Sequence, residues 1–264
     1  MRTEAYFSRK SLSLKFYDAI TALDPGISGD VAFYAQGLKP GESVLDFGCG
    51  TGRVTLGLAE LGLKAVGVDI SERMIAMAKR AAAARASDVA ARAHFVVSDV
   101  TSLSLPGKYA RVLCPFYILN LLPTRALRAN AIRVAARHLL AGGRLIAHTL
   151  PLERLKMTGR TNNLTLPPDI VTPFEDGTKL ELTWGQRIVD PGEGRTIQHV
   201  VYRHRGADGG VLDETLERLE FGWIDDREVE LAATKAGLTL IETRRGFASA
   251  QEGAERIYVF HKKV

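Results

Sequence analysis

The sequence predicts a doubly wound α/β fold whose central sheet has seven mostly parallel strands. Two observations predict the sheet: short apolar runs alternate with helical periods from residue 43 to residue 149, and a glycine-rich turn follows the first apolar run. From Glu153 onward the pattern changes. Longer runs alternate polar with β-favouring residues and are broken by glycine and proline, which predicts an antiparallel β insertion after the fifth strand.

Two short helices are predicted to open the chain, at residues 12–23 and 30–38, with the breaker Asp24-Pro25-Gly26 between them. They precede the first strand and form an N-terminal helical cap over residues 1–40. In this fold the ligand site lies at the carboxyl ends of the strands. Each of the two helices carries a polar aromatic residue, Tyr17 in the first and Tyr34 in the second.

The core of the fold is predicted over residues 41–150. Its elements, in chain order, are strand 43–48, helix 52–61, strand 64–69, helix 71–86, strand 94–98, strand 109–114, helix 124–140 and strand 143–149. The insertion occupies residues 151–223, with strands at Lys179 to Asp190, Arg195 to His204 and Val211 to Trp223. Residues 224–264 then complete the sheet with one helix and two strands, so we expect a single domain over residues 1–264.

The glycine turn indicates a nucleoside ligand. Gly48, Gly50 and Gly52 follow the first strand, and glycine allows a sharp bend and a close approach of the ligand to the backbone. Asp69 ends the next strand about 20 residues later, where such folds place an acceptor for ribose hydroxyl groups. The pattern is Gly-x-Gly-x-Gly, and Arg53 stands where a dinucleotide site would have its third glycine.

Two further carboxylates narrow the choice of ligand. Asp46 lies two residues before the first glycine, where it would repel a pyrophosphate and attract a cationic group. Asp99 ends the third strand and is suited to an adenine amino group. S-adenosylmethionine combines an adenosine with an ammonium and a sulfonium. The three strand ends therefore favour S-adenosylmethionine over a dinucleotide.

The same residues resemble a known family. The run Val44 to Arg53, the strand end at Asp69, the segment Ser98-Asp99-Val100 and the run Leu139 to Leu145 are similar, in order and spacing, to the signatures of class I S-adenosylmethionine-dependent methyltransferases of the small-molecule type. The resemblance implies a Rossmann-like sheet and S-adenosyl-L-methionine as the cofactor. It implies cofactor contacts for Tyr34, Asp46, Gly48, Gly50, Gly52, Asp69, Ile70, Met74, Asp99, Val100 and Pro115.

The implied reaction is methyl transfer to a nitrogen or oxygen of a small-molecule acceptor. Such a transfer mainly requires that the acceptor be positioned and, for some acceptors, that a proton be removed. A general base, where one is needed, could be His148 at the end of the fifth strand, Tyr17, Tyr117, or His199 or His204 of the insertion.

The resemblance also implies that the leading helices cover the cofactor, with Tyr17 and Tyr34 placed to reach it. It places Asn120 toward the acceptor. We take His148, Tyr17 and Asn120 as the candidate catalytic residues.

Two alternative functions stay open, a nucleic-acid base methyltransferase and a non-catalytic cofactor-binding scaffold. Against the first, the segment Cys114-Pro115-Phe116-Tyr117 lacks the amide or carboxylate that base-amine methylation needs. Against the second, a scaffold does not need all of the glycines and carboxylates of the site. A metal site is not expected, because no Asp or Glu occurs from Thr101 through Leu152.

Composition adds expectations about partners and location. The formal net charge is +5, but the basic residues are scattered along the chain, so nucleic acid is not expected as a partner. No apolar stretch reaches the length of a membrane span, and the two cysteines are too few for a disulfide framework. We expect a cytoplasmic protein that acts on a small molecule without a membrane partner, as a monomer or homodimer.

Overall fold

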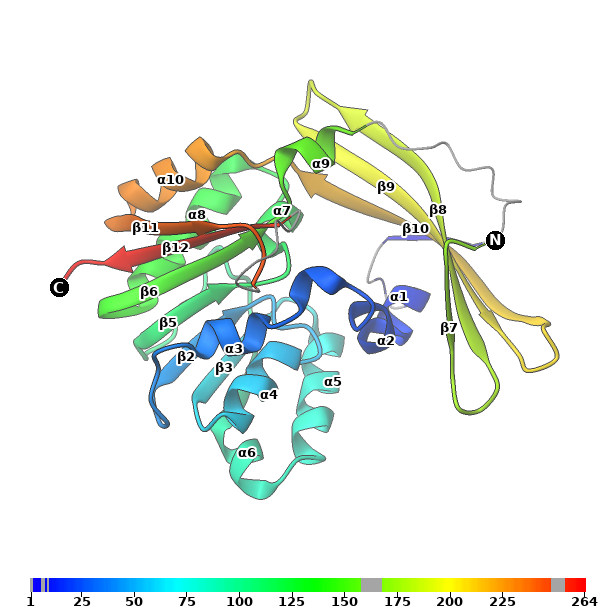
Figure 1. Ribbon diagram of the computed structural model, residues 1–264, viewed down its shortest axis with the longest axis horizontal. Helices are drawn as coiled ribbons and strands as arrows, with labels where there is room; N and C mark the ends of the chain where they lie inside the picture. Colours follow the sequence, from blue (N-terminus) through cyan, green and yellow to red (C-terminus); the bar gives the residue numbers. More distant parts are fainter. Residues whose placement is uncertain (1, 6–7, 9, 158–167, 248–254) are drawn as a thin grey trace. The chain divides into compact units, whose positions relative to one another are not determined.

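The computed structural model describes residues 2–5, 8, 10–157, 168–247 and 255–264. The chain divides into two compact units, and each is built from two separate stretches of sequence. We call the unit formed by Met1–Pro25 and Glu153–Trp223 the β unit, and the unit formed by Gly26–Leu152 and Ile224–Val264 the α/β unit. Figure 1 shows the elements of both units, coloured along the sequence.

A seven-stranded sheet forms the centre of the α/β unit, in the order β11-β12-β6-β5-β2-β3-β4. Its strands are β2 (Ser43–Phe47), β3 (Lys64–Asp69), β4 (Ala93–Val97), β5 (Tyr109–Cys114), β6 (Leu139–Thr149), β11 (Leu238–Arg244) and β12 (Arg256–Lys262). Strands β2 to β6 pair in parallel, whereas β12 is antiparallel to both β6 and β11. The order reverses at β2, which places a ligand site at the carboxyl ends of β2 and its neighbours.

Helices cover both faces of this sheet (Figure 1). They are α3 (Asp30–Ala35), α4 (Arg53–Glu60), α5 (Glu72–Ala83), α6 (Ser87–Arg92), α7 (Ile118–Leu121), α8 (Arg125–His138) and α10 (Asp226–Lys235). Successive side chains of a strand point to opposite faces of the sheet, so each strand contributes to a hydrophobic core on either face. Leu45 and Phe47 pack with α8 and α10, whereas Val44 packs with α3 and α4. Both faces of the central strands are buried, as the continuous apolar runs of the sequence predicted.

The predicted fold class is confirmed, including the strand order expected of a doubly wound sheet and the insertion after its fifth strand, β6. The boundaries of the predicted elements lie within a few residues of the observed ones. Helices α6 and α7 were not predicted, because six and four residues are too few to show a helical period. The predicted helix at 12–23 is two short helices, α1 (Leu12–Lys15) and α2 (Tyr17–Thr21).

The β unit is built on a five-stranded sheet in the order β1-β10-β9-β8-β7. Its strands are β1 (Arg2–Ala5), β7 (Ile170–Pro173), β8 (Lys179–Asp190), β9 (Arg195–Arg205) and β10 (Val211–Gly222). Helices α1 and α2 contribute Leu12, Phe16 and Ile20 to a core with residues of β8, β9 and β10. The three long strands were predicted as a meander, and β1 and β7 extend their sheet at its two edges.

The chain passes between the units at three places: at η1 (Pro25–Ile27), at α9 (Leu152–Lys156), and between Trp223 and Ile224. The predicted helical cap is therefore shared: α1 and α2 belong to the β unit, and α3 belongs to the α/β unit. The single domain expected from the sequence stays a prediction. Within the described ranges, none of the helices combines the length and the apolar character needed to span a membrane.

Gly52 provides a test of how tightly the glycine turn is packed. A Cβ added there would lie 2.9 Å from the Phe95 ring, and the φ of +91° disfavours any side chain. We expect Gly52→Ala to lower the free energy of unfolding by roughly 2–4 kcal/mol, the sum of backbone strain and overpacking. Denaturant titration of the α/β unit's transition measures this change.

Gly37 is the matched control, because its φ is +78° and nothing lies within 4 Å of an added Cβ. We expect Gly37→Ala to cost only the backbone term, about 1–2 kcal/mol. Equal losses for the two variants would show that the Phe95 contact has no energetic weight.

Candidate functional site

The chain leaves β2 through three glycines with positive φ. The angles are 68° at Gly48, 55° at Gly50 and 91° at Gly52. The backbone N–H groups of Gly48 and Cys49 donate to the carbonyl of Val68, at 2.8 and 3.0 Å. These bonds fix the turn against the neighbouring strand β3, and α4 begins immediately after Gly52.

Asp69 holds the glycine turn to the end of β3. Its Oδ2 accepts from the Gly50 backbone N–H at 3.0 Å, and its Oδ1 accepts from the Ser71 backbone N–H at 2.8 Å. Burial raises the pKa of Asp69, while the hydrogen bonds from Ser71 and Gly50 oppose that rise. Each carboxylate oxygen has a second lone pair, so Asp69 can organise the turn and still accept a ligand hydroxyl.

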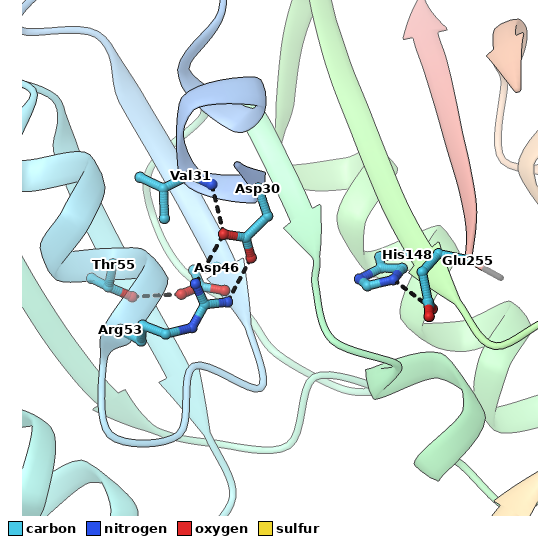
Figure 2. Close-up of polar contacts among 7 residues, drawn as sticks. All are labelled: Asp30, Val31, Asp46, Arg53, Thr55, His148 and Glu255. Carbon is cyan, nitrogen blue, oxygen red and sulfur yellow. Dashed lines mark hydrogen bonds and ion pairs between the residues drawn. The ribbon is translucent and has the colours of Figure 1, made fainter. Parts of the chain in front are cut away.

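Asp46 is fully buried between the sheet and α4. Thr55 Oγ1 donates to its Oδ2 at 2.6 Å, as Figure 2 shows. Its other oxygen, Oδ1, has no hydrogen-bond partner among the described residues. Burial raises the pKa of Asp46 to about 7, against the opposing effects of the Thr55 hydrogen bond and the Arg53 charge. A buried carboxylate with an unpaired oxygen is costly, and a cationic ligand would relieve that cost.

Tyr34 is the second buried polar group at this place. It lies on α3 with no exposed surface, and its hydroxyl also lacks a hydrogen-bond partner within the described part of the chain. Burial raises the pKa of Tyr34 well above its ordinary value, and the charges of Asp30 and Asp46 raise it further. The hydroxyl is therefore neutral and able both to donate and to accept.

An ion pair joins α3 to the glycine turn. Arg53, the first residue of α4, donates Nη1 to Asp30 Oδ1 at 2.9 Å and Nη2 to Asp30 Oδ2 at 2.5 Å, as Figure 2 shows. Asp30 is 2% exposed and also accepts from the Val31 backbone N–H. The pair fixes the helix that carries Tyr34. The sequence does not predict this pair, because Asp30 and Arg53 are 23 positions apart and no local pattern connects them.

The remaining predicted cofactor residues lie at or near the same edge of the sheet. Ile70 is 72% exposed beside Asp69, whereas Met74 is buried on α5. Asp99 follows β4 and accepts from the Thr101 backbone N–H at 2.8 Å. Two more predicted residues are buried, Val100 and Pro115.

These side chains fit the ligand that the sequence predicts. Asp46 Oδ1 and the Tyr34 hydroxyl are buried polar atoms without partners in the part of the chain that the structure describes, which suits an ammonium group that donates hydrogen bonds. The exposed Ile70 offers apolar surface beside Asp69, which suits a nucleoside. Among the described residues there is no group of three or more side chains that could hold a metal ion.

The three candidate catalytic residues are placed differently. His148, near the end of β6, is fully buried, and Glu255 Oε2 lies 3.1 Å from its Nε2 (Figure 2). Asn120 is also fully buried on α7, where its Oδ1 accepts from the Leu150 backbone N–H at 3.0 Å. Tyr17 lies half-buried on α2 of the β unit. The catalytic roles of all three stay predictions.

The strand order of the α/β unit, with a glycine turn after β2, is that of the Rossmann-like fold that the sequence predicted. Solved methyltransferases share this fold. Residues 44–143 match the family described as a methyltransferase domain. That match covers the strands from β2 to the start of β6. It therefore contains the glycine turn and all three carboxylates.

Known proteins resemble the chain over its core and over its whole length. It is 36% identical over 113 residues to a demethylmenaquinone methyltransferase of Beutenbergia cavernae, covering 42% of each chain. The chain spans about half the length of the curated relatives that it matches.

Two solved structures match nearly the whole chain. The CcbJ methyltransferase from Streptomyces caelestis has a TM-score of 0.73 at 22% identity, covering 96% of each chain. CalS10, a SAM-bound amino pentose methyltransferase from Micromonospora echinaspora, has a TM-score of 0.72 at 16% identity, covering 97% of this chain and 100% of its own. At these identities the likeness concerns the fold.

The pKa of Asp46 predicts how stability depends on pH. The pKa of Asp46 is about 7 in the folded protein, against an ordinary value of 3.8. Between pH 3.8 and pH 7, Asp46 is therefore protonated in the folded state and ionised in the unfolded state. Ionising Asp46 then costs up to roughly 4 kcal/mol as pH rises through this window. We expect Asp46→Asn to gain stability relative to wild type from pH 4 to pH 7, with no further change above. Thermal unfolding across this range measures the difference.

Asp88→Asn is the control for this measurement. Asp88 is exposed, and its hydrogen bond with Arg92 lowers its pKa. The Asp88→Asn variant should therefore gain no stability relative to wild type between pH 5 and pH 8. A constant difference between Asp46→Asn and wild type over that range would contradict the raised pKa of Asp46.

The Asp30–Arg53 pair should couple strongly in a double-mutant cycle. Asp30 is almost completely buried, so removing Arg53 strands its charge in the protein interior. We expect Asp30→Asn and Arg53→Gln to give an interaction energy of at least about 1 kcal/mol in the free energy of unfolding. The exposed i,i+4 pair Asp88–Arg92 should give roughly 0.3–0.5 kcal/mol. Equal coupling of the two pairs would refute the structural role assigned to Asp30.

Proposed function

We propose that the protein transfers a methyl group from S-adenosyl-L-methionine to a nitrogen or oxygen of a small-molecule acceptor. The proposal rests mainly on a cluster of buried polar groups beside the glycine turn. There, Asp46 Oδ1 and the Tyr34 hydroxyl are buried and lack partners among the described residues. A ligand with an ammonium group would satisfy both atoms.

The cofactor would be held along three strand ends. Asp46 and Tyr34 would receive its ammonium, and Asp69 would accept from the ribose hydroxyls. Asp99 would accept from the adenine amino group, with Ile70 against the base. When bound, S-adenosylmethionine supplies an electrophilic methyl carbon. The chain's own contribution is to position the acceptor, exclude water and receive a proton where one is released.

A small amine is the acceptor class to test first. CalS10, which the chain resembles in fold over nearly its whole length, is described as an amino pentose methyltransferase. Most of the β unit, Glu153–Trp223, is inserted in the sequence between β6 and the last strands of the seven-stranded sheet, and insertions of this kind commonly carry substrate specificity. We therefore infer that the β unit contributes to acceptor recognition. A cytoplasmic location and a monomeric or homodimeric state stay predictions of the sequence.

The end of β5 gives no support to the nucleic-acid alternative. Its last residue, Cys114, occupies the position where methylation of a base amine would need an amide or carboxylate, and it is fully buried. Burial raises the pKa of its thiol, so it is a neutral side chain in the core. The alternative of a non-catalytic scaffold makes a separate prediction, namely cofactor binding without turnover.

Cofactor binding tests the first half of the proposal. We expect S-adenosylmethionine to bind the purified protein with micromolar affinity, and Asp69→Asn to weaken binding at least about tenfold, because an amide cannot accept both backbone bonds and the ribose hydroxyls. Isothermal titration calorimetry measures both values. Asp88→Asn, which changes an exposed carboxylate, should bind like wild type.

Turnover tests the second half. A library of small amines and alcohols, incubated with the cofactor and the full chain, should yield a product heavier by one methyl group in mass spectrometry. Binding without any methylated product across the library would favour the scaffold. Absence of cofactor binding would overturn the proposal as a whole.

A further inference from the structure

A buried histidine and a buried glutamate meet at the carboxyl end of β6, away from the glycine turn. His148 has no exposed surface and Glu255 is 4% exposed. His148 Nε2 lies 3.1 Å from Glu255 Oε2, as Figure 2 shows. Glu255 directly precedes β12, and His148 pairs with Ile257 in the register of the β6–β12 ladder. The ladder thus brings together two residues that are 107 positions apart in the sequence.

Core packing alone does not explain this pair. Several neighbouring positions are apolar, since Ile146, Ala147 and Ile257 lie in the hydrophobic cores, whereas the next pair along the ladder is Thr149 and Arg256. Burying an imidazole and a carboxylate costs desolvation that an apolar pair would avoid.

The hydrogen bond determines which nitrogen of His148 carries the proton. A carboxylate is only an acceptor, so the hydrogen in this contact belongs to Nε2. In the neutral ring, Nδ1 then presents a bare lone pair. Nδ1 is buried and has no hydrogen-bond partner among the described residues. A lone pair left unsatisfied in this way is a site for a donor supplied by a ligand.

The surroundings of the ring connect it to the predicted acceptor side of the sheet. The Tyr117 ring lies 4.6 Å from the His148 ring, and the Phe247 ring lies 4.9 Å away, centroid to centroid. The Tyr117 backbone N–H donates to the His148 carbonyl at 3.2 Å. His148 therefore borders the turn that follows β5, at the edge of the sheet where ligands bind in this fold.

This turn is under backbone strain. Phe116 and Tyr117 have φ of 43° and 65°, and no other non-glycine residue in the described ranges has a positive φ. Such conformations cost of order 1–3 kcal/mol each and concentrate at ligand clamps and active sites. Of the two aromatic rings packed against the imidazole, the Tyr117 ring is carried by this strained turn.

We propose that Glu255 is the positioning residue that holds His148 as the Nε2–H tautomer, so that Nδ1 serves as the proton acceptor for the methylated nitrogen. The inference rests on the proposed function. One N–H proton of the acceptor's ammonium form passes to Nδ1, whose lone pair forms the new N–H bond. The freed nitrogen lone pair forms the new bond to the methyl carbon, and the electrons of the C–S bond leave on sulfur. The Glu255 carboxylate balances the positive charge of the resulting imidazolium.

Nitrogen NMR tests the tautomer without any acceptor. In the full chain labelled with ¹⁵N-histidine, long-range ¹H–¹⁵N spectra at pH 7.5 distinguish a protonated from a bare ring nitrogen, and His148→Gln assigns the His148 signals by their loss. We expect Nε2–H with bare Nδ1 in the wild type. We expect Glu255→Gln to bring the Nδ1–H form to at least about a third of the population, because a glutamine amide can donate to Nε2 as well as accept from it.

Glu230→Gln is the matched control, because Glu230 is exposed on α10. It should leave the His148 signals unchanged. A wild-type His148 that carries hydrogen on Nδ1, as the other tautomer or as imidazolium, would overturn the proposal. So would an unchanged His148 spectrum in Glu255→Gln.

Calorimetry and kinetics separate this inference from the proposed function. Glu255→Gln should bind S-adenosylmethionine like wild type, because Glu255 lies outside the cofactor residues. With an amine substrate from the library, it should lower kcat at least about tenfold and leave the KM for the cofactor unchanged, and Glu255→Asp should recover part of the rate. Failure of the wild type to bind the cofactor would refute the proposed function. Normal binding with an Nδ1–H tautomer would refute only the role of Glu255.

Discussion

A single carboxylate organises the ligand edge of the α/β unit. Asp69 receives one backbone N–H from the turn after β2 and another from the turn after β3, and so joins two strand ends through its two oxygens. Both hydrogen bonds are made by a charged acceptor in a partly buried place, where they are strong. Gly50 makes its bond to Asp69 from within a turn whose three glycines all have positive φ. The glycine turn and the carboxylate therefore depend on each other, and a ligand that uses one meets the other already positioned.

Around this junction the protein holds polar groups without the solvent that would normally stabilise them. Asp46 and Tyr34 are completely buried, and the Asp30–Arg53 pair fixes the helix that carries Tyr34. Burying these polar groups lowers the stability of the fold. In the same low-dielectric surroundings, their electrostatic interactions with a bound cation are strong. The His148–Glu255 pair, farther along the same edge, is also buried, and the Nδ1 atom of His148 has no hydrogen-bond partner among the described residues. The two clusters give the sheet edge one region suited to a cationic cofactor and another suited to a proton.

Most of the fold could be predicted because its signals are local. Apolar runs of strand length, helical periods between them and a glycine turn identify β2 to β6 and their helices from neighbouring residues alone. The short helices α6 and α7 could not be predicted, since four to six residues carry no period. The pairing of β1 with β10 joins residues more than 200 positions apart, and no local pattern encodes it. The division of the leading helices between two units is likewise a property of packing.

The sequence by itself determined the class of fold and the position of the glycines and aspartates at neighbouring strand ends, because these residues and their spacing act within a few positions of one another. Only the tertiary structure decided which polar groups are paired. Arg53 pairs with Asp30 across two helices, His148 pairs with Glu255 across a strand ladder, and one oxygen of Asp46 has no partner among the described residues. These outcomes depend on burial and on contacts between distant segments, and both arise only when the chain is packed.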